Sequence, residues 1–367
     1  MSNLSEQFNL KPSFHQLSVD MYFDHARHAR ELDRLFVQGP GYVGHRQWAP
    51  DQGDWRSIPW ENDGRLLVHN QRGIELLSNV CRHRQAIMLR GHGNQQNIVC
   101  PLHRWTYDLD GTLMGAPHFA EAPCSRLEKF PLQDWRGLQF SSRRDISKEL
   151  SGVPFLAEFD FNGFILDKIQ IHECRYNWKT FIEVYLEDYH VDPFHPGLGQ
   201  FVNCSNLQWF TGVNWSVQSV GLKAGLRRPG TPVYAKWHEA VRHFSNDQDP
   251  AYGAIWFCMY PNIMVEWYPH VLVVSTLHPR GPRHTTNYVE FYYPEEIAWF
   301  EHEFVEAEQA AYMETAIEDD EIAMRMDEGR EALLKRGANE IGPYQSPMED
   351  GMQHFHEWYK QAMQEVR

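Results

Sequence analysis

The sequence predicts an α+β protein with two domains: a small all-β domain, then a larger domain that combines an antiparallel sheet with long helices. The chain has 367 residues, which is long for a single hydrophobic core. Short strand-like segments with turn signals fill residues 42–150, and residues 253–293 read as closely spaced strands followed by a long acidic helix. We therefore divide the chain at 1–41, 42–150 and 151–367, and expect the helical lead-in to pack with the last domain.

The charge balance limits the classes of partner. Acidic residues outnumber basic ones by 49 to 34, giving a net charge of −15, so nucleic acid and anionic membranes are poor partners. We find no apolar run long enough to span a bilayer, and the opening residues, MSNLSEQFNLKPS, lack an apolar signal core. We expect a cytoplasmic protein.

The first half of the chain should contain one helix and then only strands. Apolar residues at helical spacing predict a helix over 25–36, which Gly39-Pro40-Gly41 would end. Strands at 66–68 and 74–77 flank the turn sequence 70–73, which indicates a hairpin, and a second tight turn is expected at 108–111. We predict no helix between residues 41 and 141.

The second half alternates strands and helices. Residues 151–175 have a strand-like pattern, and apolar spacing predicts a helix over 177–190 that Asp192-Pro193 would end. Pro294-Glu295-Glu296 is typical of the start of a helix, because proline is tolerated there and carboxylates favour the first turn. An antiparallel sheet is predicted from four strands, 254–258, 263–268, 271–277 and 287–293.

The cysteines fall into two groups. A disulfide framework is not expected in a long cytosolic chain, and four cysteines without ligand-like spacing are interpreted as core thiols: Cys124, Cys174, Cys204 and Cys258. Cys81 and Cys100 differ, because His83 and His103 follow them in the patterns Cys-x-His and Cys-x-x-His.

Two cysteines and two histidines are the ligand set of a Rieske [2Fe–2S] centre, with the cysteines on one iron and the histidines on the other. The two halves are separated by 16 residues, and turn-forming residues lie beside each. A structural zinc site accepts the same four ligands, but the Cys-x-His half is unusual for zinc. We therefore predict an iron–sulfur cluster on Cys81, His83, Cys100 and His103, with zinc as the alternative.

A second metal site is predicted further along the chain. Glu187 and His190 are three residues apart and would share a helix face, and His195 follows just past the predicted helix end. Two histidines and one carboxylate form the facial triad of non-heme Fe(II) oxygenases, which leaves positions open for O₂ and substrate. The carboxylate could be Glu187, or it could come from the acidic triplet Glu318-Asp319-Asp320, whose alternative interpretation is a solvated helix face.

With both motifs in place, the chain resembles the terminal oxygenase, or α subunit, of the Rieske non-heme iron oxygenases. The resemblance extends over most of the chain from about residue 20. It rests on five stretches: CRHRQAIML, CPLHRWTYDLDGTL, NWK, YLEDYHVDPFHPG and EDDEIAMRMDEG. It implies an N-terminal Rieske domain and a C-terminal helix-grip catalytic domain.

The resemblance also implies roles for individual residues. Cys81, His83, Cys100 and His103 would hold the cluster. His190 and His195 would bind Fe(II), and the third ligand would be an aspartate on the late helix. The spacing to Gly329 matches Asp319 best, with Asp320 as the fallback.

Glu187 takes the bridging role by the same resemblance. The resemblance implies a homotrimer, in which a carboxylate joins the Rieske histidine of one subunit to an iron ligand of the next. Glu187 would therefore join His103 of one subunit to His190 of its neighbour. Most members have aspartate at the bridge. In having glutamate there, this chain resembles the branch of the family that acts on carnitine and glycine betaine. Two further departures are Gln85 and Arg104, which stand where the family usually has glycine.

The implied activity is O₂-dependent hydroxylation of a small organic substrate: arene hydroxylation, or oxidative N- or O-demethylation. Electrons would come from a separate NAD(P)H reductase, with or without a ferredoxin, since no flavin or dinucleotide motif is found here. The alternatives are a Rieske electron carrier without oxygenase activity and a zinc-stabilised small-molecule-binding protein. No motif identifies the substrate.

Overall fold

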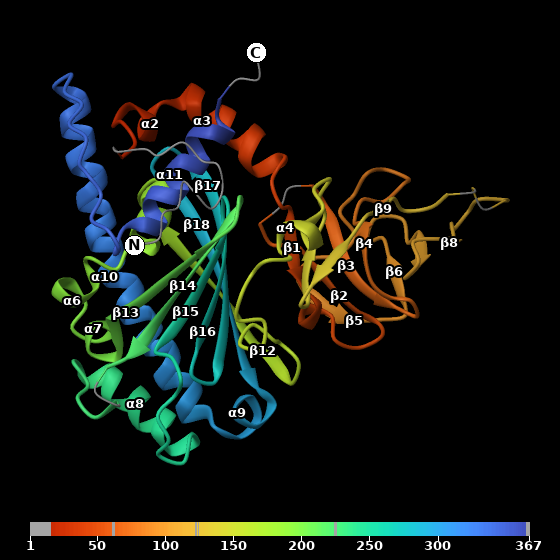
Figure 1. Ribbon diagram of the computed structural model, residues 1–367. Coiled ribbons are helices and arrows are strands. Elements are labelled where there is room, and N and C mark those ends of the chain that lie inside the picture. Colours follow the sequence, from red (N-terminus) through yellow and green to blue (C-terminus); the bar gives the residue numbers. More distant parts are fainter. Residues whose placement is uncertain (1–15, 61–62, 122, 124, 224–225, 365–367) are drawn as a thin grey trace. The chain divides into compact units, whose positions relative to one another are not determined.

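The structure is a computed structural model that describes residues 16–60, 63–121, 123, 125–223 and 226–364. The chain divides into two compact units (Figure 1). One unit is Pro40–Lys148, and the other joins the described residues before Pro40 to those from Glu149 onward. The predicted α+β class is confirmed, with an all-β first unit and a second unit that combines an antiparallel sheet with helices.

The smaller unit consists of short antiparallel strands in three sheets, ordered β5-β2-β3-β4-β9, β6-β7-β8 and β1-β11-β10. The predicted hairpin at 66–77 is present as β3 and β4. The described strands are β1 (Tyr42–His45), β2 (Asp54–Ser57), β3 (Arg65–Asn70), β4 (Gly73–Ser78), β5 (His92–Asn94), β6 (Asn97–Val99), β7 (Thr106–Asp108), β8 (Leu113–Gly115), β9 (Lys129–Phe130), β10 (Gln133–Trp135) and β11 (Leu138–Phe140). Between residues 41 and 141 the described helical structure is a single 3-10 turn, Arg46–Trp48.

The larger unit is organised around a seven-stranded antiparallel sheet of order β12-β18-β17-β16-β15-β14-β13. The four strands predicted in the late part of the chain are all present and adjacent in this sheet. Its strands are β12 (Phe164–Cys174), β13 (Val202–Thr211), β14 (Trp215–Leu222), β15 (Ala254–Met259), β16 (Ile263–Tyr268), β17 (Val271–Gly281) and β18 (His284–Pro294). Strands β13 and β14 were not predicted.

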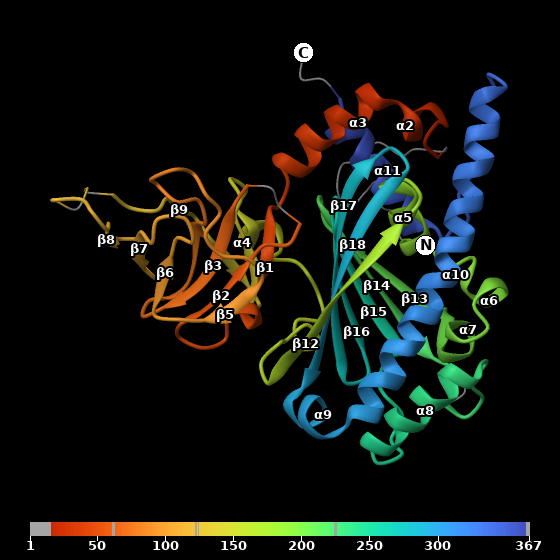
Figure 2. The same ribbon diagram turned by 180° about the vertical axis from the view of Figure 1, so that it is seen from behind.

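The helices of this unit include one that is far longer than the rest, α10 (His302–Lys335). Figure 2 shows α10 crossing in front of the sheet. The others are α2 (Asp20–Phe23), α3 (His25–Glu31), the π-helical turn Leu32–Val37, α5 (Trp178–Tyr185), α6 (Val191–Phe194), α7 (Leu198–Phe201), α8 (Pro232–Phe244), α9 (Glu295–Phe300) and α11 (Asp350–Ala362); α4 (Ile146–Glu149) lies at the boundary of the two units. The sequence analysis did not predict α8 or α11.

One face of the sheet carries the core of this unit. Alternate residues of β15 point to this face: Ala254 and Trp256 pack in a cluster with α10 residues such as Phe304, whereas Cys258 packs with Trp178 of α5 and residues of α11. Because successive strand residues point to opposite faces, these residues share a face. The long helix and the α5–α11 pair therefore cover different parts of the same sheet face.

Two predicted helix boundaries are wrong. The helix predicted over 177–190 ends at Tyr185, because the backbone beyond it pairs with the segment before and within α11: the Asp188 N–H donates to the carbonyl of Met348 (3.1 Å), and the Met352 N–H donates to that of Leu186 (3.0 Å). Asp192-Pro193 does not stop a helix but lies within α6, whose first turn tolerates proline.

The acidic helix predicted from residue 295 is two helices. Helix α9 ends at Phe300, and α10 begins at His302 after the non-helical Glu301. The break allows α10 to take its own direction.

The early helices are tied to the rest of the larger unit by a buried ion pair. The Lys179 ammonium at the start of α5 lies 2.8 Å from a carboxylate oxygen of Glu31, and both side chains are about 1% exposed. Glu31 also accepts hydrogen bonds from the Trp178 indole and the Tyr359 hydroxyl. Removing one partner of such a pair is costly, so this network fixes the lead-in against α5 and α11.

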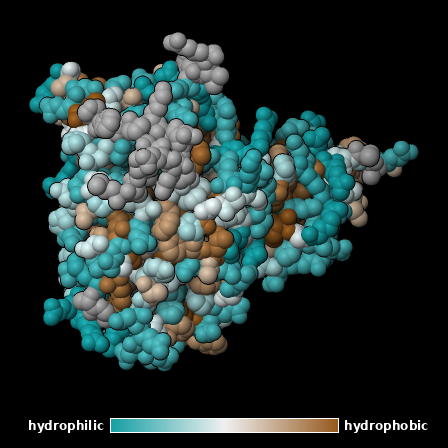
Figure 3. Space-filling model, in the orientation of Figure 1, coloured by the Kyte–Doolittle hydropathy of each residue, from teal (hydrophilic) through white to brown (hydrophobic). Residues whose placement is uncertain are grey.

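Hydrophilic residues cover most of the molecular face in Figure 3. Among the described residues, no helix combines the length and the apolar character needed to cross a membrane.

Candidate metal centres and substrate pocket

Two similar loops of the smaller unit present the first predicted ligand set. In one, the Gln85 N–H donates to the carbonyl of Cys81 (3.0 Å); in the other, the Arg104 N–H donates to the carbonyl of Cys100 (3.1 Å). Gln85 and Arg104 both have positive φ, at 53° and 58°. Residues without a side chain fit this left-handed conformation best, which explains physically why glycine is usual at these two positions.

The structure brings the four predicted cluster ligands together. Cys81 and Cys100 are buried, and the rings of His83 and His103 lie with centroids 4.6 Å apart. The indole of Trp105 stacks on His83, and Nδ1 of His83 is buried without a hydrogen-bond partner. Two buried thiols and two adjacent imidazoles, one with an unpartnered nitrogen, fit a Rieske [2Fe–2S] cluster.

The second predicted site lies between α10 and the segment after α5. Nε2 of His195 lies 3.0 Å from Oδ1 of Asp319, and Nε2 of His190 lies 3.4 Å from the same oxygen. The two Nε2 atoms are 2.9 Å apart. Ligands at right angles and about 2.1 Å from one ion would lie about 3 Å apart, so the three atoms fit a two-histidine, one-carboxylate site.

A second layer of carboxylates orients both imidazoles. Nδ1 of His190 donates to Glu187 (2.6 Å), and Nδ1 of His195 donates to Glu318 (2.7 Å). Each ring is thereby held in the tautomer that leaves Nε2 free to bind a metal. The expectation that Glu187 and His190 share a helix face is wrong, because α5 ends at Tyr185. Glu187 instead accepts hydrogen bonds from both the backbone N–H and the ring of His190.

The site is electronegative. Burial alone would lower the pKa of His190, but Asp319 and Glu187 outweigh burial and raise it to about 10. The pKa of His195 is raised by Asp319 and Glu318, again against burial. The pKa of Asp319 is lowered because the two histidines outweigh its burial. This charge distribution favours a bound cation.

The acidic triplet is not a solvated helix face. Its three carboxylates contact three different histidines: Glu318 contacts His195, Asp319 lies between His190 and His195, and Asp320 contacts His172. The triplet was proposed as a source of one ligand, but the role of Glu318 in orienting His195 was not predicted. The hydrogen bond depends on a residue 123 positions away in the chain, which local sequence does not show.

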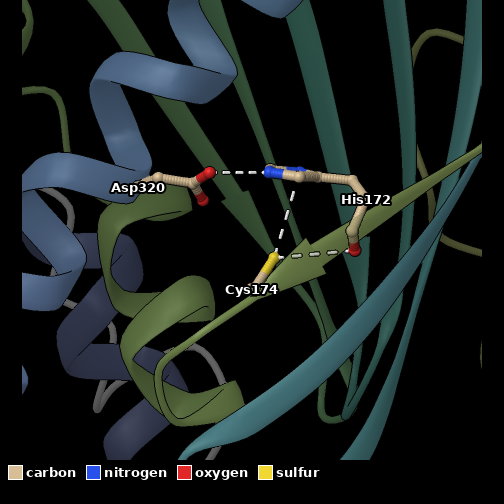
Figure 4. A group of neighbouring side chains, drawn as sticks. All are labelled: His172, Cys174 and Asp320. Atoms are coloured by element: carbon tan, nitrogen blue, oxygen red, sulfur yellow. Dashed lines mark hydrogen bonds and ion pairs between the residues drawn. The ribbon is translucent and has the colours of Figure 1, made fainter.

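Asp320, the fallback ligand, is directed to strand β12. Figure 4 shows its carboxylate facing the His172 ring, whose Nε2 lies 2.7 Å from Oδ2 of Asp320, with the Cys174 sulfur below the ring. Asp320 also accepts a hydrogen bond from Tyr176 (2.8 Å). Cys174, Cys204 and Cys258 are buried free thiols, and Cys124 lies outside the described residues. The Sγ of Cys174 lies 3.9 Å from Nδ1 of His172, so this thiol has a polar neighbour that the sequence did not indicate.

A pocket opens beside the two histidines and Asp319. It is lined by aromatic side chains together with polar and a few aliphatic ones. The polar lining includes two buried carboxylates that the sequence analysis did not single out, Glu266 and Glu308. Among the described residues, no lysine or arginine lines it. The aromatic lining residues are Tyr176, Phe181, Tyr185, Tyr234, Trp237, Trp256, Tyr268 and Tyr312.

Two family models cover the two units of the chain. Residues 46–131 match the Rieske [2Fe-2S] domain, and residues 165–365 match the ring hydroxylating alpha subunit (catalytic domain). This chain belongs to the ring-hydroxylating oxygenase alpha subunits. The cofactors of this family are a Rieske cluster and a mononuclear iron, and the predicted family and cofactors are confirmed.

Relatives of this alpha subunit include two oxygenases with full-length similarity. The putrescine 2-hydroxylase of Ralstonia nicotianae is 64% identical, covering 99% of this chain and 100% of the relative. The putrescine 2-hydroxylase of Bordetella bronchiseptica is 55% identical, covering 100% of this chain and 89% of the relative. The carnitine monooxygenase oxygenase subunit of Escherichia coli is 24% identical over 70% of this chain and 71% of its own length.

Solved structures show the same fold as this alpha subunit. The quaternary ammonium Rieske monooxygenase CntA superposes with a TM-score of 0.76 at 19% identity, covering 95% of this chain and 96% of that one. Naphthalene 1,2-dioxygenase from Rhodococcus sp. gives a TM-score of 0.71 at 20% identity, covering 94% and 93%. The two family models and the full-length relatives identify the chain as an oxygenase component, in place of the two alternatives, a Rieske electron carrier without oxygenase activity and a zinc-stabilised small-molecule-binding protein.

The positive-φ loops generate a stability prediction. Replacing Arg104 or Gln85 with glycine should raise the free energy of unfolding by about 0.5–1 kcal/mol, since a left-handed non-glycine residue costs about 1–2 kcal/mol and the added chain entropy of glycine offsets part of the gain. Thermal loss of the cluster absorbance would measure the shift. Arg84→Gly, at a neighbouring residue that is not among those with positive φ, is the control and should destabilise. A lower midpoint for both test variants would contradict the interpretation.

The carboxylate layer generates a second prediction. Glu318→Gln should weaken mononuclear iron binding by about 10–100-fold, because the amide no longer holds His195 as a strong acceptor would. Iron titration of metal-depleted protein would measure this, with the Rieske signal as an internal reference. Glu321→Gln is the control, since Glu321 pairs with Arg325 on the exposed side of the same helix. Equal iron affinity in the two variants would count against a role for Glu318.

Proposed function

We propose that this chain is the terminal oxygenase that hydroxylates putrescine, a four-carbon diamine, at carbon 2. The reaction balances as R–H + O₂ + 2 e⁻ + 2 H⁺ → R–OH + H₂O, with the electrons supplied by a separate NAD(P)H reductase. Full-length similarity at 64% identity to a putrescine 2-hydroxylase supports this substrate. The observation that carries the proposal is the charge of the pocket beside the histidine–aspartate site.

A dicationic substrate suits this pocket. Glu266 and Glu308 are 4% and 2% exposed, and no lysine or arginine is found among the described lining residues. Buried carboxylates without a cation are costly, and burial accordingly raises the pKa of Glu266 to about 7 and that of Glu308 to about 8. A substrate ammonium group would supply the missing positive charge.

The same features argue against the other substrate classes considered for the family. A neutral arene or methyl ether would leave both carboxylates without a counter-ion. A quaternary ammonium ion, such as carnitine carries, would suit the aromatic walls through cation–π contacts but has no N–H to donate. A primary ammonium group has three N–H donors, so it satisfies both the charge and the hydrogen-bonding capacity of the carboxylates.

Each part of the site has a defined task in this proposal. His190, His195 and Asp319 would hold the mononuclear iron, with Glu187 and Glu318 fixing the imidazoles. Cys81, His83, Cys100 and His103 would hold the Rieske cluster, and the two groups when bound would supply electron transfer and O₂ activation. The aromatic walls, with Tyr234 and Trp237 among them, exclude water from the reacting carbon and confine the alkyl chain.

The proposal includes transfer of electrons between subunits of a homotrimer. The Rieske histidine His103 of one subunit would approach Glu187 of the next, which contacts His190. Support comes from the short Glu187–His190 hydrogen bond and from the partial exposure of the Glu187 side chain, 15%, which leaves it accessible to a partner. The next residue, Asp188, is buried. Its burial, and after that the negative charge of Glu187, raises the pKa of Asp188 to about 7.

The substrate assignment is tested with purified protein and a surrogate reductase. Wild-type protein should show putrescine-dependent O₂ uptake and form 2-hydroxyputrescine, identified by mass spectrometry and by comparison with a synthetic standard. Choline, carnitine and naphthalene are the comparison substrates and should be turned over at least tenfold more slowly. Turnover of one of these in preference to putrescine would refute the assignment while leaving the oxygenase class intact.

The bridge is tested by Glu187→Gln. The variant should keep both iron centres, with a normal Rieske EPR signal, yet lose product formation, because the amide is a weaker acceptor and cannot carry a charge between the histidines. Glu187→Asp, which restores the carboxylate usual in the family, should keep part of the activity. Full turnover in the glutamine variant, or a monomer in sedimentation analysis of active protein, would remove the bridge proposal.

A further inference from the structure

The pocket has an ordered polar end away from the metal site. Gln218, Trp256 and Glu266 are opposite one another on β14, β15 and β16, so they form a row across one sheet face. Glu266 accepts hydrogen bonds from Tyr268 (2.7 Å) and from Tyr312 of α10 (3.2 Å), and the Trp256 indole donates to the same Tyr268 hydroxyl (2.8 Å). The carboxylate is therefore held rigidly in place.

The long helix orders the pocket along its length. Glu308, Tyr312, Thr315 and Asp319 recur at spacings of four, three and four residues, so they lie on one face of α10, and all four line the pocket. Tyr312 is seven residues from Asp319, which is about 10 Å along the helix. The charge of Asp319 contributes to raising the pKa of Glu266, whereas the carboxylates acting on Glu308 are Glu266 and Asp167. Glu266 accepts a hydrogen bond from Tyr312, which lies between Glu308 and Asp319 on this face of α10, so the carboxylate is placed between the metal site and Glu308.

Unpartnered acceptors accompany the two carboxylates. The side-chain oxygens of Gln218 and Asn287 are buried without hydrogen-bond partners, and both residues are at most 2% exposed and line the pocket. The buried hydroxyl of Tyr185, which also lines the pocket, has no hydrogen-bond partner among the described residues. Buried acceptors without donors are uncommon in folded proteins and indicate a ligand that donates hydrogen bonds.

Basic side chains near this end are few. Lys168 acts on Glu308 electrostatically, but it is exposed and its ammonium lies over the ring of Phe291. The hydroxyl of Tyr293, which is not among the residues that line the pocket, donates to Glu308. Both donors to Glu266, Tyr268 and Tyr312, by contrast line the pocket.

We propose that Glu266 is the specificity-determining residue that binds the distal ammonium group of the diamine, with Glu308 closing the pocket behind it. This inference rests on the proposed function, because it assigns the recognition of the same substrate. The rigid position of Glu266 relative to Asp319 fixes how far the distal nitrogen lies from the metal, and so determines which carbon is presented for hydroxylation. Gln218 and Asn287 accept the remaining N–H groups of the substrate.

The test compares isosteric variants on three substrates: putrescine, 1,5-diaminopentane and 1-aminobutane, which lacks the distal nitrogen. Glu266→Gln should raise the Kd and KM for putrescine by about 100-fold, because a buried charge-assisted hydrogen bond is lost. Its preference for putrescine over 1-aminobutane should fall by a similar factor. Glu266→Asp, which keeps the charge but is one methylene shorter, should shift preference toward the longer diamine.

Glu290→Gln is the matched control, since Glu290 is a buried carboxylate on the opposite face of β18, outside the pocket. Binding is measured by calorimetry on holoprotein, with iron content and thermal midpoint recorded for each variant. An unchanged Kd and an unchanged diamine preference in a folded, iron-loaded Glu266→Gln protein would overturn the inference while wild-type activity on putrescine stands. Absence of wild-type activity on putrescine would instead refute the proposed function.

Discussion

The catalytic unit depends on the packing of one helix, α10, against one face of the seven-stranded sheet. A helix places residues four, three and four apart on one side, so a single apolar and acidic stripe of α10 can line a pocket over three turns. Asp319 at one end of this stripe meets two histidines from another segment, and Glu308 at the other end closes the pocket. Phe304 and Ala311 anchor the same helix in the core, so the positions of the pocket residues follow from hydrophobic packing.

Carboxylates serve three separate purposes around this helix. Asp319 contacts both imidazoles directly, Glu187 and Glu318 hold the imidazoles from behind, and Glu266 with Glu308 makes the pocket anionic. These groups of carboxylates differ in the side chains that they contact. Asp319, Glu187 and Glu318 contact histidines, whereas Glu266 and Glu308 accept hydrogen bonds from tyrosines, and their pKa is raised because burial outweighs those bonds. In the proposed function, this anionic lining recognises a positively charged substrate.

The two units differ in how far their sites could be predicted. The cluster ligands lie in short loops in which Cys81 and His83, or Cys100 and His103, are close in the chain, so spacing alone indicated them. The departures at Gln85 and Arg104 were visible in the sequence, but their meaning depends on φ, which is positive at both. The helix predicted over 177–190 was too long because hydrogen bonds to the segment around α11, far along the chain, end it at Tyr185. Local periodicity cannot anticipate a partner of that kind.

The sequence by itself determined the fold class, the hairpin of the first unit, four strands of the large sheet, and the family, because these depend on short-range spacing and on motifs read within a few residues. Tertiary structure decided which member of Glu318-Asp319-Asp320 meets both His190 and His195, since helix rotation and packing bring Asp319 to both rings, Glu318 to His195 alone and Asp320 to His172. It also decided the character of the pocket. Glu266 and Glu308 are ordinary acids in the sequence, and only the packing of α10 on the sheet buries them in one pocket, with no lysine or arginine among the described lining residues.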